Sequence, residues 1–213
     1  MADWCFVLAR TEPGSVRSQG LSYLLVPMDQ PGVTVRPIRQ LTGTSEFNEV
    51  FFDGARTDAA NVVGVPGDGW RVAKATLTLE RGAAMLGLQA GFRRELENLL
   101  AVARRTAAGS DPLLRDKLAR AWIGLEAVRA YALDTLGGPG EAAEASVLKI
   151  LWSRWHQRLG ELAMEVLGAP SMVGDDEWHR LFLFSRAETI YGGSDEIQRN
   201  IIAARALGLP RPP

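Results

Sequence analysis

The first sixty or so positions carry apolar residues in short runs or in alternation with polar ones, the pattern that β-strands produce. Pro-Gly and Asp-Gly pairs separate the runs, and both pairs favour turns. Val, Leu, Ile and Phe dominate within each run, as is typical of strands that bury one face. We expect strands at residues 5–9, 22–26, 33–38 and 49–52.

Near Gly69 the apolar spacing changes to the three-or-four-residue repeat of amphipathic helices. We expect a long first helix, a second that opens at Asp111-Pro112, a third that ends at Gly168 and a last one after Ser194. A less regular stretch around Asp175–Trp178 precedes the last helix. Short connections are typical of antiparallel neighbours in a bundle. The three expected apolar faces are formed by Phe92, Leu96, Leu99, Leu100 and Ala103; by Leu114, Leu118, Ala121, Leu125, Val128 and Ala132; and by Val147, Leu151, Trp155, Leu159, Leu162 and Val166.

Composition narrows the classes of protein that these patterns allow. The chain has 213 residues, 46% of them hydrophobic, and a formal net charge of −1. No apolar run is long enough to span a bilayer, and scattered Lys and Arg give no basic surface for nucleic acid. The single cysteine, Cys5, excludes an internal disulfide and fits a reducing, cytoplasmic compartment.

Two other groups of residues offer weak signals for chemistry. His156 and His179 are far apart in sequence and lack supporting ligands, so we interpret both as structural rather than metal-binding. Gly67-Asp68-Gly69 is not followed by a Lys-Ser/Thr pair, which excludes a phosphate-binding loop of the P-loop kind.

The most informative segment is Ile190–Asn200, where Gly192-Gly193 opens onto Ser194 and the last helix. Two glycines allow positive φ and a close approach of the backbone to a ligand, while Ser194 is a good N-cap. Taken alone, the segment predicts a capped helix start whose N–H groups can hold a polar oxygen.

A second segment, Leu77–Gly82, makes the glycine turn easier to interpret, because the two segments together resemble the acyl-CoA dehydrogenase family. The resemblance extends over nearly the whole chain. In this family a flavin takes a hydride from the β-carbon of an acyl-CoA while a carboxylate removes the α-proton. The pieces similar to the family's β-domain are Ala2–Thr11, Gly20–Pro27, Gly43–Phe52, Asn61–Gly64 and Gly67–Trp70.

The resemblance also implies a catalytic base in an alternative position. Gly192 stands where many members carry the catalytic Glu in a Tyr-Glu-Gly-Thr motif, whereas Glu80, followed by Arg81, matches a subset whose base lies on the long helix. Glu80 is then the expected base, the Gly192 N–H holds the thioester oxygen, and Arg81 and Gly193 flank the substrate. We expect Glu80 and the glycine turn to face one another across a cleft. The alternatives are that Glu80 is a surface residue pairing with Arg81 or Lys74, and that Arg81 braces the helix.

For the cofactor, the resemblance implies FAD. Ser194 and Glu196 fall at positions that contact its pyrophosphate and adenosine end, and Glu165, Gly168 and Ala169 fall where a Gln, Gly, Gly set reaches the flavin of a neighbouring subunit. Two of those three residues differ from the set. The segment Arg104–Gly109 also replaces the family's Arg-x-x-Phe-Gly, so flavin binding across the interface is altered or assigned to a partner chain in a homo- or hetero-oligomer.

The resulting hypothesis is an FAD-dependent acyl-CoA dehydrogenase of fatty acid β-oxidation type. It would act on a bulky or branched acyl-CoA, with an electron-transferring flavoprotein as acceptor. The alternatives are a non-catalytic subunit of a heteromeric dehydrogenase and an acyl-CoA oxidase.

The expected architecture is an α+β fold, with a partial antiparallel β-domain at residues 1–66 and an all-α, four-helix-type bundle at 67–213. In the resembling family, an all-helical domain and the opening strands of the β-domain come before the position of Met1. A mis-set start, a fragment and a split protein are the three explanations left open. We expect the chain alone to be poorly soluble or oligomeric and to retain little FAD.

Overall fold

The computed structural model describes residues 2–137 and 142–210, and the side chains of the same residues except 78–86, 136, 137 and 142. The chain divides into two compact units, residues 1–79 and 80–213. Each unit is described by itself below. The domain boundary expected at 66/67 stays a prediction.

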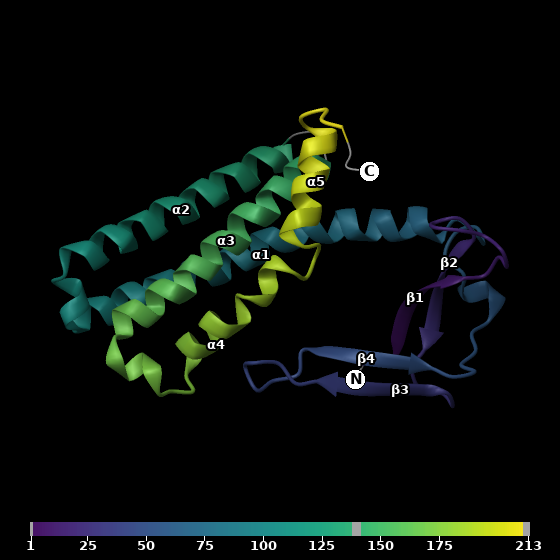
Figure 1. The fold of residues 1–213 in the computed structure, drawn as a ribbon, viewed down its shortest axis with the longest axis horizontal. Coiled ribbons are helices and arrows are strands. Elements are labelled where there is room, and N and C mark those ends of the chain that lie inside the picture. The colour runs from purple at the N-terminus through teal and green to yellow at the C-terminus, as the bar shows by residue number, and fades with distance from the viewer. Residues whose placement is uncertain (1, 138–141, 211–213) are drawn as a thin grey trace. The chain divides into compact units, whose positions relative to one another are not determined.

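The first unit contains two antiparallel strand pairs (Figure 1). Strand β1 (Trp4–Arg10) pairs with β2 (Leu21–Pro27), and β3 (Val33–Ile38) pairs with β4 (Phe47–Phe52). All four agree with the sequence prediction to within two residues. A single turn of 3-10 helix, η1 (Ala59–Asn61), follows the strands. The unit therefore has the antiparallel β character that alternation and turn residues indicated.

Large apolar side chains remain exposed on these strands. Trp4, Phe6, Phe47, Phe51 and Phe52 are each between 39% and 59% exposed. Within β2, Tyr23 and Val26 are buried. Exposed aromatic residues in such number are typical of surfaces that bind another polypeptide.

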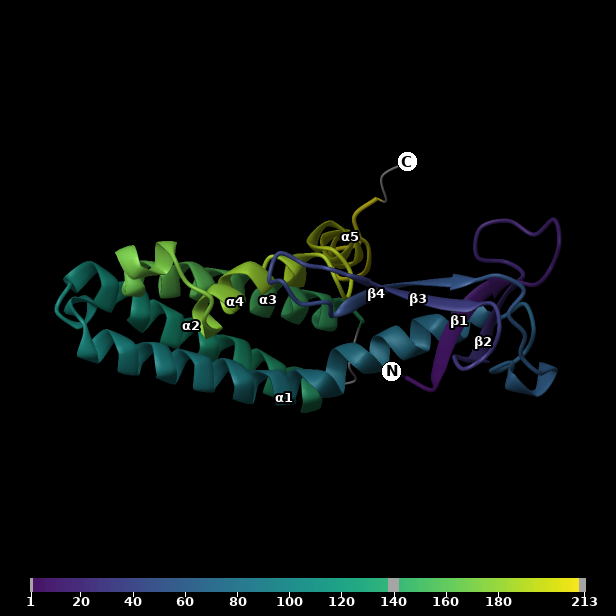
Figure 2. The same ribbon diagram turned by 90° about the horizontal axis from the view of Figure 1, so that it is seen from below.

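The second unit is helical and has its centre on α3 (Ala142–Leu167), which packs against α2 (Pro112–Gly137), α4 (Glu177–Phe184) and α5 (Asp195–Arg205) (Figures 1 and 2). The long helix α1 (Gly69–Arg105) enters this unit from the first and contributes Phe92, Leu96, Leu99 and Ala103 to the core. Short 3-10 turns, η2 (Ala107–Gly109), η3 (Ala169–Met172) and η4 (Ala187–Thr189), connect the helices. The predicted α+β class with a C-terminal helical bundle is confirmed.

The bundle core follows the predicted apolar faces on α1 and α2 but deviates on α3. Leu148 and Trp152 are buried, whereas Leu151 is 40% exposed and Val147 only half-buried. From Trp155 onward the predicted face holds, with Leu159 fully buried. The first turns of α3 carry apolar residues on several sides, so apolar periodicity alone did not identify the buried side there.

Helix α4 lies in the stretch that the sequence indicated as irregular. Asp176 is its N-cap, because the Asp176 carboxylate accepts hydrogen bonds from the N–H groups of Trp178 and His179. Trp178 and Leu181, three positions apart, bury the inner face of the helix. An Asp cap followed by this spacing is a helix signal, but eight residues are too few for the periodicity to stand out.

Two glycines allow helices to approach α3 closely. A Cβ at Gly124 on α2 would come within 2.8 Å of Trp155 Cδ1, and a Cβ at Gly160 on α3 would come within 3.0 Å of Phe182 Cα on α4. The second contact is with backbone, which cannot move aside as a side chain can. Gly160 therefore sets how closely α4 packs.

We expect Gly160→Ala to lower the free energy of unfolding by about 1–3 kcal/mol because the added methyl overpacks the α3–α4 contact. Gly91 in the interior of α1 is the matched control, since a Cβ there meets nothing within 4 Å. Gly91→Ala should stabilise the helix by up to about 1 kcal/mol. Urea unfolding of both variants checks this, and equal effects of the same sign would contradict it.

A group of charged side chains is buried within the bundle. His156 on α3 is 6% exposed and Glu188 in η4 is 4% exposed. The His156 Nδ1 lies 2.8 Å from both carboxylate oxygens of Glu188, and its Nε2 lies 2.8 Å from Glu95 Oε2 on α1. Burial by itself lowers the pKa of His156, but the hydrogen bonds and charges of Glu188 and Glu95 outweigh it and raise that pKa to about 9. His156 is therefore a cation at neutral pH, with the ring of Trp155 stacked 6.1 Å from its own.

Stability should consequently depend on pH between the unfolded and folded pKa values of His156. The contribution is complete below pH 6.5 and is lost as the pH rises through about 9, because the folded pKa is the higher one. We expect the free energy of unfolding to fall over this window by up to about 3 kcal/mol. Urea unfolding followed by circular dichroism measures it. Glu188→Gln should flatten the dependence and His179→Gln should keep most of it; an unchanged slope in Glu188→Gln would refute the assignment.

Candidate functional site

The turn at Gly192-Gly193 has a backbone that only glycine adopts without strain. The φ angles are +66° at Gly192 and +97° at Gly193, both in the left-handed region. Ser194 follows as the N-cap of α5, its hydroxyl accepting a hydrogen bond from the N–H of Ile197. The capped helix start predicted from Gly-Gly-Ser is present.

The peptide carbonyls of this turn are hydrogen-bonded by a protein side chain, but its peptide N–H groups are not. Gln198, which is fully buried, donates from Nε2 to the carbonyls of Gly192 and Gly193 at 3.1 and 3.2 Å. Within the described part of the chain, the N–H groups of the two glycines donate to no protein acceptor. Gly192 is also exposed. The turn therefore has fixed carbonyls and two N–H donors open to a ligand oxygen.

The segment before the turn is fixed by α3. Lys149 is buried and donates from Nζ to the carbonyl of Glu188. Its ammonium lies over the ring of Tyr191, 5.6 Å from the ring centroid, and over that of Trp152 at 4.7 Å. The Tyr191 N–H closes the local turn by donating to the carbonyl of Ala187 at 3.0 Å. Lys149 and Glu188 are site residues that sequence reasoning missed, because the partners are 39 positions apart.

The first turn of α5 is rich in charge. Asp195 is 1% exposed and pairs with Arg154 Nε at 2.5 Å. Glu196 is exposed, and its pKa is lowered first by a hydrogen bond from its own backbone N–H and then by the Ser194 hydroxyl. Among the described residues, Asp195 Oδ1 and Gln198 Oε1 are buried without a partner. Unpaired oxygens beside open N–H groups fit a polar cofactor with hydroxyl and phosphate groups.

The other three predicted cofactor residues lie together at the far end of α3. Glu165 pairs with Lys117 on α2 at 2.5 Å, Gly168 follows the helix with φ of +65°, and Ala169 opens η3. Glu165 is sixteen positions beyond Lys149 on one helix, about 24 Å at 1.5 Å per residue. The structure thus brings Gly192, Gly193, Ser194 and Glu196 together and places Glu165, Gly168 and Ala169 elsewhere in the same chain.

Glu80 and Arg81 lie on α1, and their side chains are outside the described residues. Their roles, and the expected opposition of Glu80 to the glycine turn, stay predictions.

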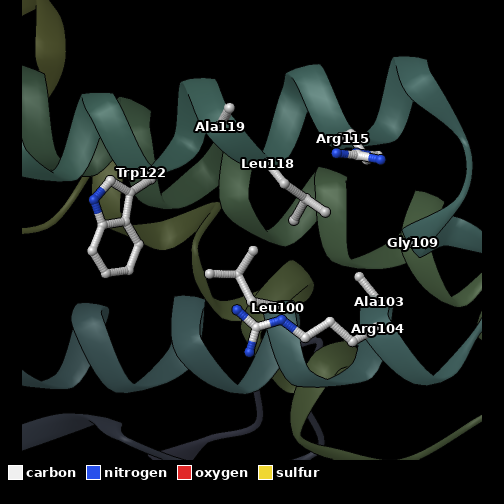
Figure 3. Close-up of a pocket in the computed structure, with 8 residues that line it drawn as sticks. All are labelled: Leu100, Ala103, Arg104, Gly109, Arg115, Leu118, Ala119 and Trp122. Atoms are coloured by element: carbon white, nitrogen blue, oxygen red, sulfur yellow. The ribbon is translucent and has the colours of Figure 1, made fainter.

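A cavity of about 420 Å³ lies between α1 and α2, around the segment that replaces Arg-x-x-Phe-Gly (Figure 3). Figure 3 shows Leu100 and Leu118 pointing toward one another from the two helices, with Trp122 at one end and Arg115 at the other. A second cavity of about 590 Å³ lies between α2 and α3 and is lined partly by Glu165. Both are cavities of the bundle, not of the glycine turn.

Within the part of the chain that the structure describes, no helix combines the length and the apolar character that crossing a bilayer requires. No cluster of three or more His, Cys, Asp or Glu side chains suited to a metal ion occurs there either.

Comparison with known proteins gives consistent results. The family model for the acyl-CoA dehydrogenase C-terminal domain matches residues 67–207. Acyl-CoA dehydrogenase IpdE1 of Mycobacterium tuberculosis is 65% identical over 99% of this chain and 56% of its own length. The protein of the same name from Mycolicibacterium smegmatis is 61% identical, with 99% and 54% covered. The chain spans about half the length of these curated relatives.

Solved structures agree with that result. The structure named Tcur3481-Tcur3483 steroid ACAD has a TM-score of 0.90 at 26% identity, covering 99% of this chain and 58% of that one. A chain of the ChsE4-ChsE5 complex from Mycobacterium tuberculosis has a TM-score of 0.85 at 27% identity, covering 99% and 58%. Because the family model matches residues 67–207, which is well over half of the chain, the chain belongs to the acyl-CoA dehydrogenase family.

Proposed function

We propose that the protein containing this chain is an FAD-dependent acyl-CoA dehydrogenase that converts an acyl-CoA thioester to the trans-2-enoyl-CoA. The observation that carries the proposal is the Gly192-Gly193 turn, with two open N–H donors and no carboxylate of its own. Glu80 on α1 supplies the carboxylate that position 192 lacks.

The residues of the turn fit a flavin nucleotide. Ser194 and Glu196 at the start of α5 would hold its pyrophosphate and adenosine end, where the dipole of an eleven-residue helix favours phosphate. Glu165, Gly168 and Ala169 would approach the flavin of a neighbouring subunit, which agrees with their separation from the turn. When bound, the flavin supplies the acceptor for the hydride that leaves the β-carbon.

The chain's own residues would carry the proton chemistry. The Glu80 carboxylate takes the α-proton, and the electron pair of the broken C–H bond forms the new C=C bond. Meanwhile the Gly192 N–H donates to the thioester oxygen as negative charge develops there, and one such donor contributes about 3–4 kcal/mol in comparable sites. Arg81 and Gly193 would complete the substrate's surroundings.

The printed names of two neighbours support a choice of substrate and assembly. One is called a steroid ACAD and another is a complex of ChsE4 with ChsE5. We propose a bulky or branched acyl group, a homo- or hetero-oligomer in the cytoplasm, and an electron-transferring flavoprotein as acceptor. Formation of hydrogen peroxide in air at the rate of substrate turnover would instead identify an oxidase.

The second candidate is a non-catalytic subunit of a heteromeric dehydrogenase. The chain covers 56% of the first relative's length, and Glu165 and Ala169 depart from the family's flavin-contacting set. In this case the chain would complete a flavin site whose base lies on another subunit.

Substitution of the base separates the two candidates. In the complete enzyme, Glu80→Gln should slow flavin bleaching by acyl-CoA by about 100-fold to 10,000-fold, because an amide keeps the shape but accepts no proton. Glu97→Gln makes the same chemical change at an exposed position of α1 and should leave bleaching unaltered. Anaerobic stopped-flow absorbance at 450 nm measures the rate. Undiminished bleaching in Glu80→Gln would favour the non-catalytic subunit.

Adding Gly192→Glu to the Glu80→Gln protein should restore part of the rate, since the new carboxylate reaches the α-proton from the opposite wall. The Cβ has room, as its nearest neighbour is Lys149 Cε at 3.6 Å. A side chain at φ of +66° costs about 1–2 kcal/mol, so the rescue should be incomplete. Gly193→Glu is the control one position away and should restore nothing; equal rescue by both would contradict the geometry.

A further inference from the structure

We propose that Glu188 is a positioning residue, clamped by His156, Glu95 and Lys149 so that the Gly192-Gly193 turn presents its N–H donors in one fixed orientation. These four residues are called the Glu188 clamp. The inference rests on the proposed function of the turn and adds the device that orients it.

The clamp contacts Glu188 at both the side chain and the backbone. The carboxylate oxygens of Glu188 each lie 2.8 Å from His156 Nδ1, and the carbonyl of Glu188 accepts a hydrogen bond from Lys149. Glu95 holds the opposite edge of the imidazole at 2.8 Å. The 3-10 turn η4 is thereby attached to α3 and, through Glu95, to α1.

Three residues separate Glu188 from Gly192, and local hydrogen bonds make this connection stiff. The N–H groups of Ile190 and Tyr191 both donate to the carbonyl of Ala187, at 2.9 and 3.0 Å. The ring of Tyr191 lies against Lys149, the residue that also bonds Glu188. A shift of Glu188 therefore moves the peptide that enters Gly192.

On the exit side of the turn, Gln198 holds the carbonyls of Gly192 and Gly193. Gln198 holds both carbonyls, and the clamp fixes the residues that precede the turn. The orientation of the two glycine N–H groups is therefore fixed as well. Catalysis by hydrogen-bond donors depends on such prior orientation, because donors that must reorganise lose most of their effect.

Stability alone explains the clamp poorly. Burying the Glu188 carboxylate against an imidazolium carries a desolvation cost that well-packed apolar side chains would avoid. Both ring nitrogens face carboxylate oxygens, so only the imidazolium, with two N–H donors, satisfies the arrangement. The charged groups that contact the ring are Glu95 from α1 and Glu188 from η4, whereas Lys149 from α3 contacts the carbonyl of Glu188. Loss of the ring proton at alkaline pH would leave a ring nitrogen against a carboxylate and release the turn.

Hydrogen–deuterium exchange on this chain tests the clamp without any need for catalysis. In Glu188→Gln, the peptides covering residues 189–194 should exchange at least about tenfold faster than in wild type, while the core of α3 changes little. Glu95→Gln removes the half-exposed outer partner and should give the same local effect to a smaller degree. His179→Gln, at the chain's other histidine, should leave residues 189–194 unchanged.

The complete enzyme gives an independent second readout. Glu188→Gln should lower the flavin reduction rate at saturating acyl-CoA by about tenfold, with a much smaller change in substrate affinity, because the donors act mainly on the developing charge. In wild type the same rate should decline as the pH rises toward 9, and in Glu188→Gln this decline should shift to lower pH. His179→Gln should keep the wild-type rate and profile.

The outcomes separate the clamp from the proposed function. If the wild-type enzyme does not reduce its flavin with acyl-CoA, the proposed function fails, and the exchange experiment still decides the clamp. Unchanged exchange at 189–194 in a folded Glu188→Gln protein overturns the clamp, as does faster exchange spread evenly over the whole bundle. If Glu188→Gln does not fold, Glu95→Gln decides by the same criterion.

Discussion

A carboxylate that is removed from water must be compensated by nearby charge, and Glu188 meets this requirement on α3. His156 faces its carboxylate and Lys149 holds its carbonyl, so one helix compensates the side chain and anchors the backbone. The apolar side of α3 packs against α1, α2 and α4. The same helix therefore organises the bundle and orients the loop that carries the candidate site.

The site itself relies on backbone rather than on side chains. Gly192 contributes peptide groups, and a peptide N–H persists through any substitution that keeps the conformation. Under the proposed function, this division explains how position 192 can lack the family's carboxylate and keep the donor for the thioester oxygen. What limits the choice of residue at position 192 is the backbone φ of +66°, not a lack of space, because the atom nearest to an added Cβ is 3.6 Å away.

The sequence predicted most of the elements because their signals are local. Turn pairs bounded the strands, and Ser194 marked the start of α5 through its own cap. Helix α4 was missed because eight residues give two turns of periodicity, and the face of α3 was misplaced where apolar residues surround the helix. The partners of Glu188 and the role of Gln198 could not be predicted. Both depend on contacts between distant segments, and apolar periodicity does not specify how such segments pack. Glu80 came from family resemblance alone and stays a prediction.

The stacking of Trp155 on His156 gives the molecule an optical reporter of its own. The two rings lie 6.1 Å apart and are inclined by only 9°. An imidazolium is a better acceptor of an excited electron than a neutral imidazole, so we expect the emission of Trp155 to be weaker when His156 carries its proton. With the other tryptophans replaced by phenylalanine, the emission of this one indole would follow the protonation state of the buried histidine in the folded protein, continuously and without any added label.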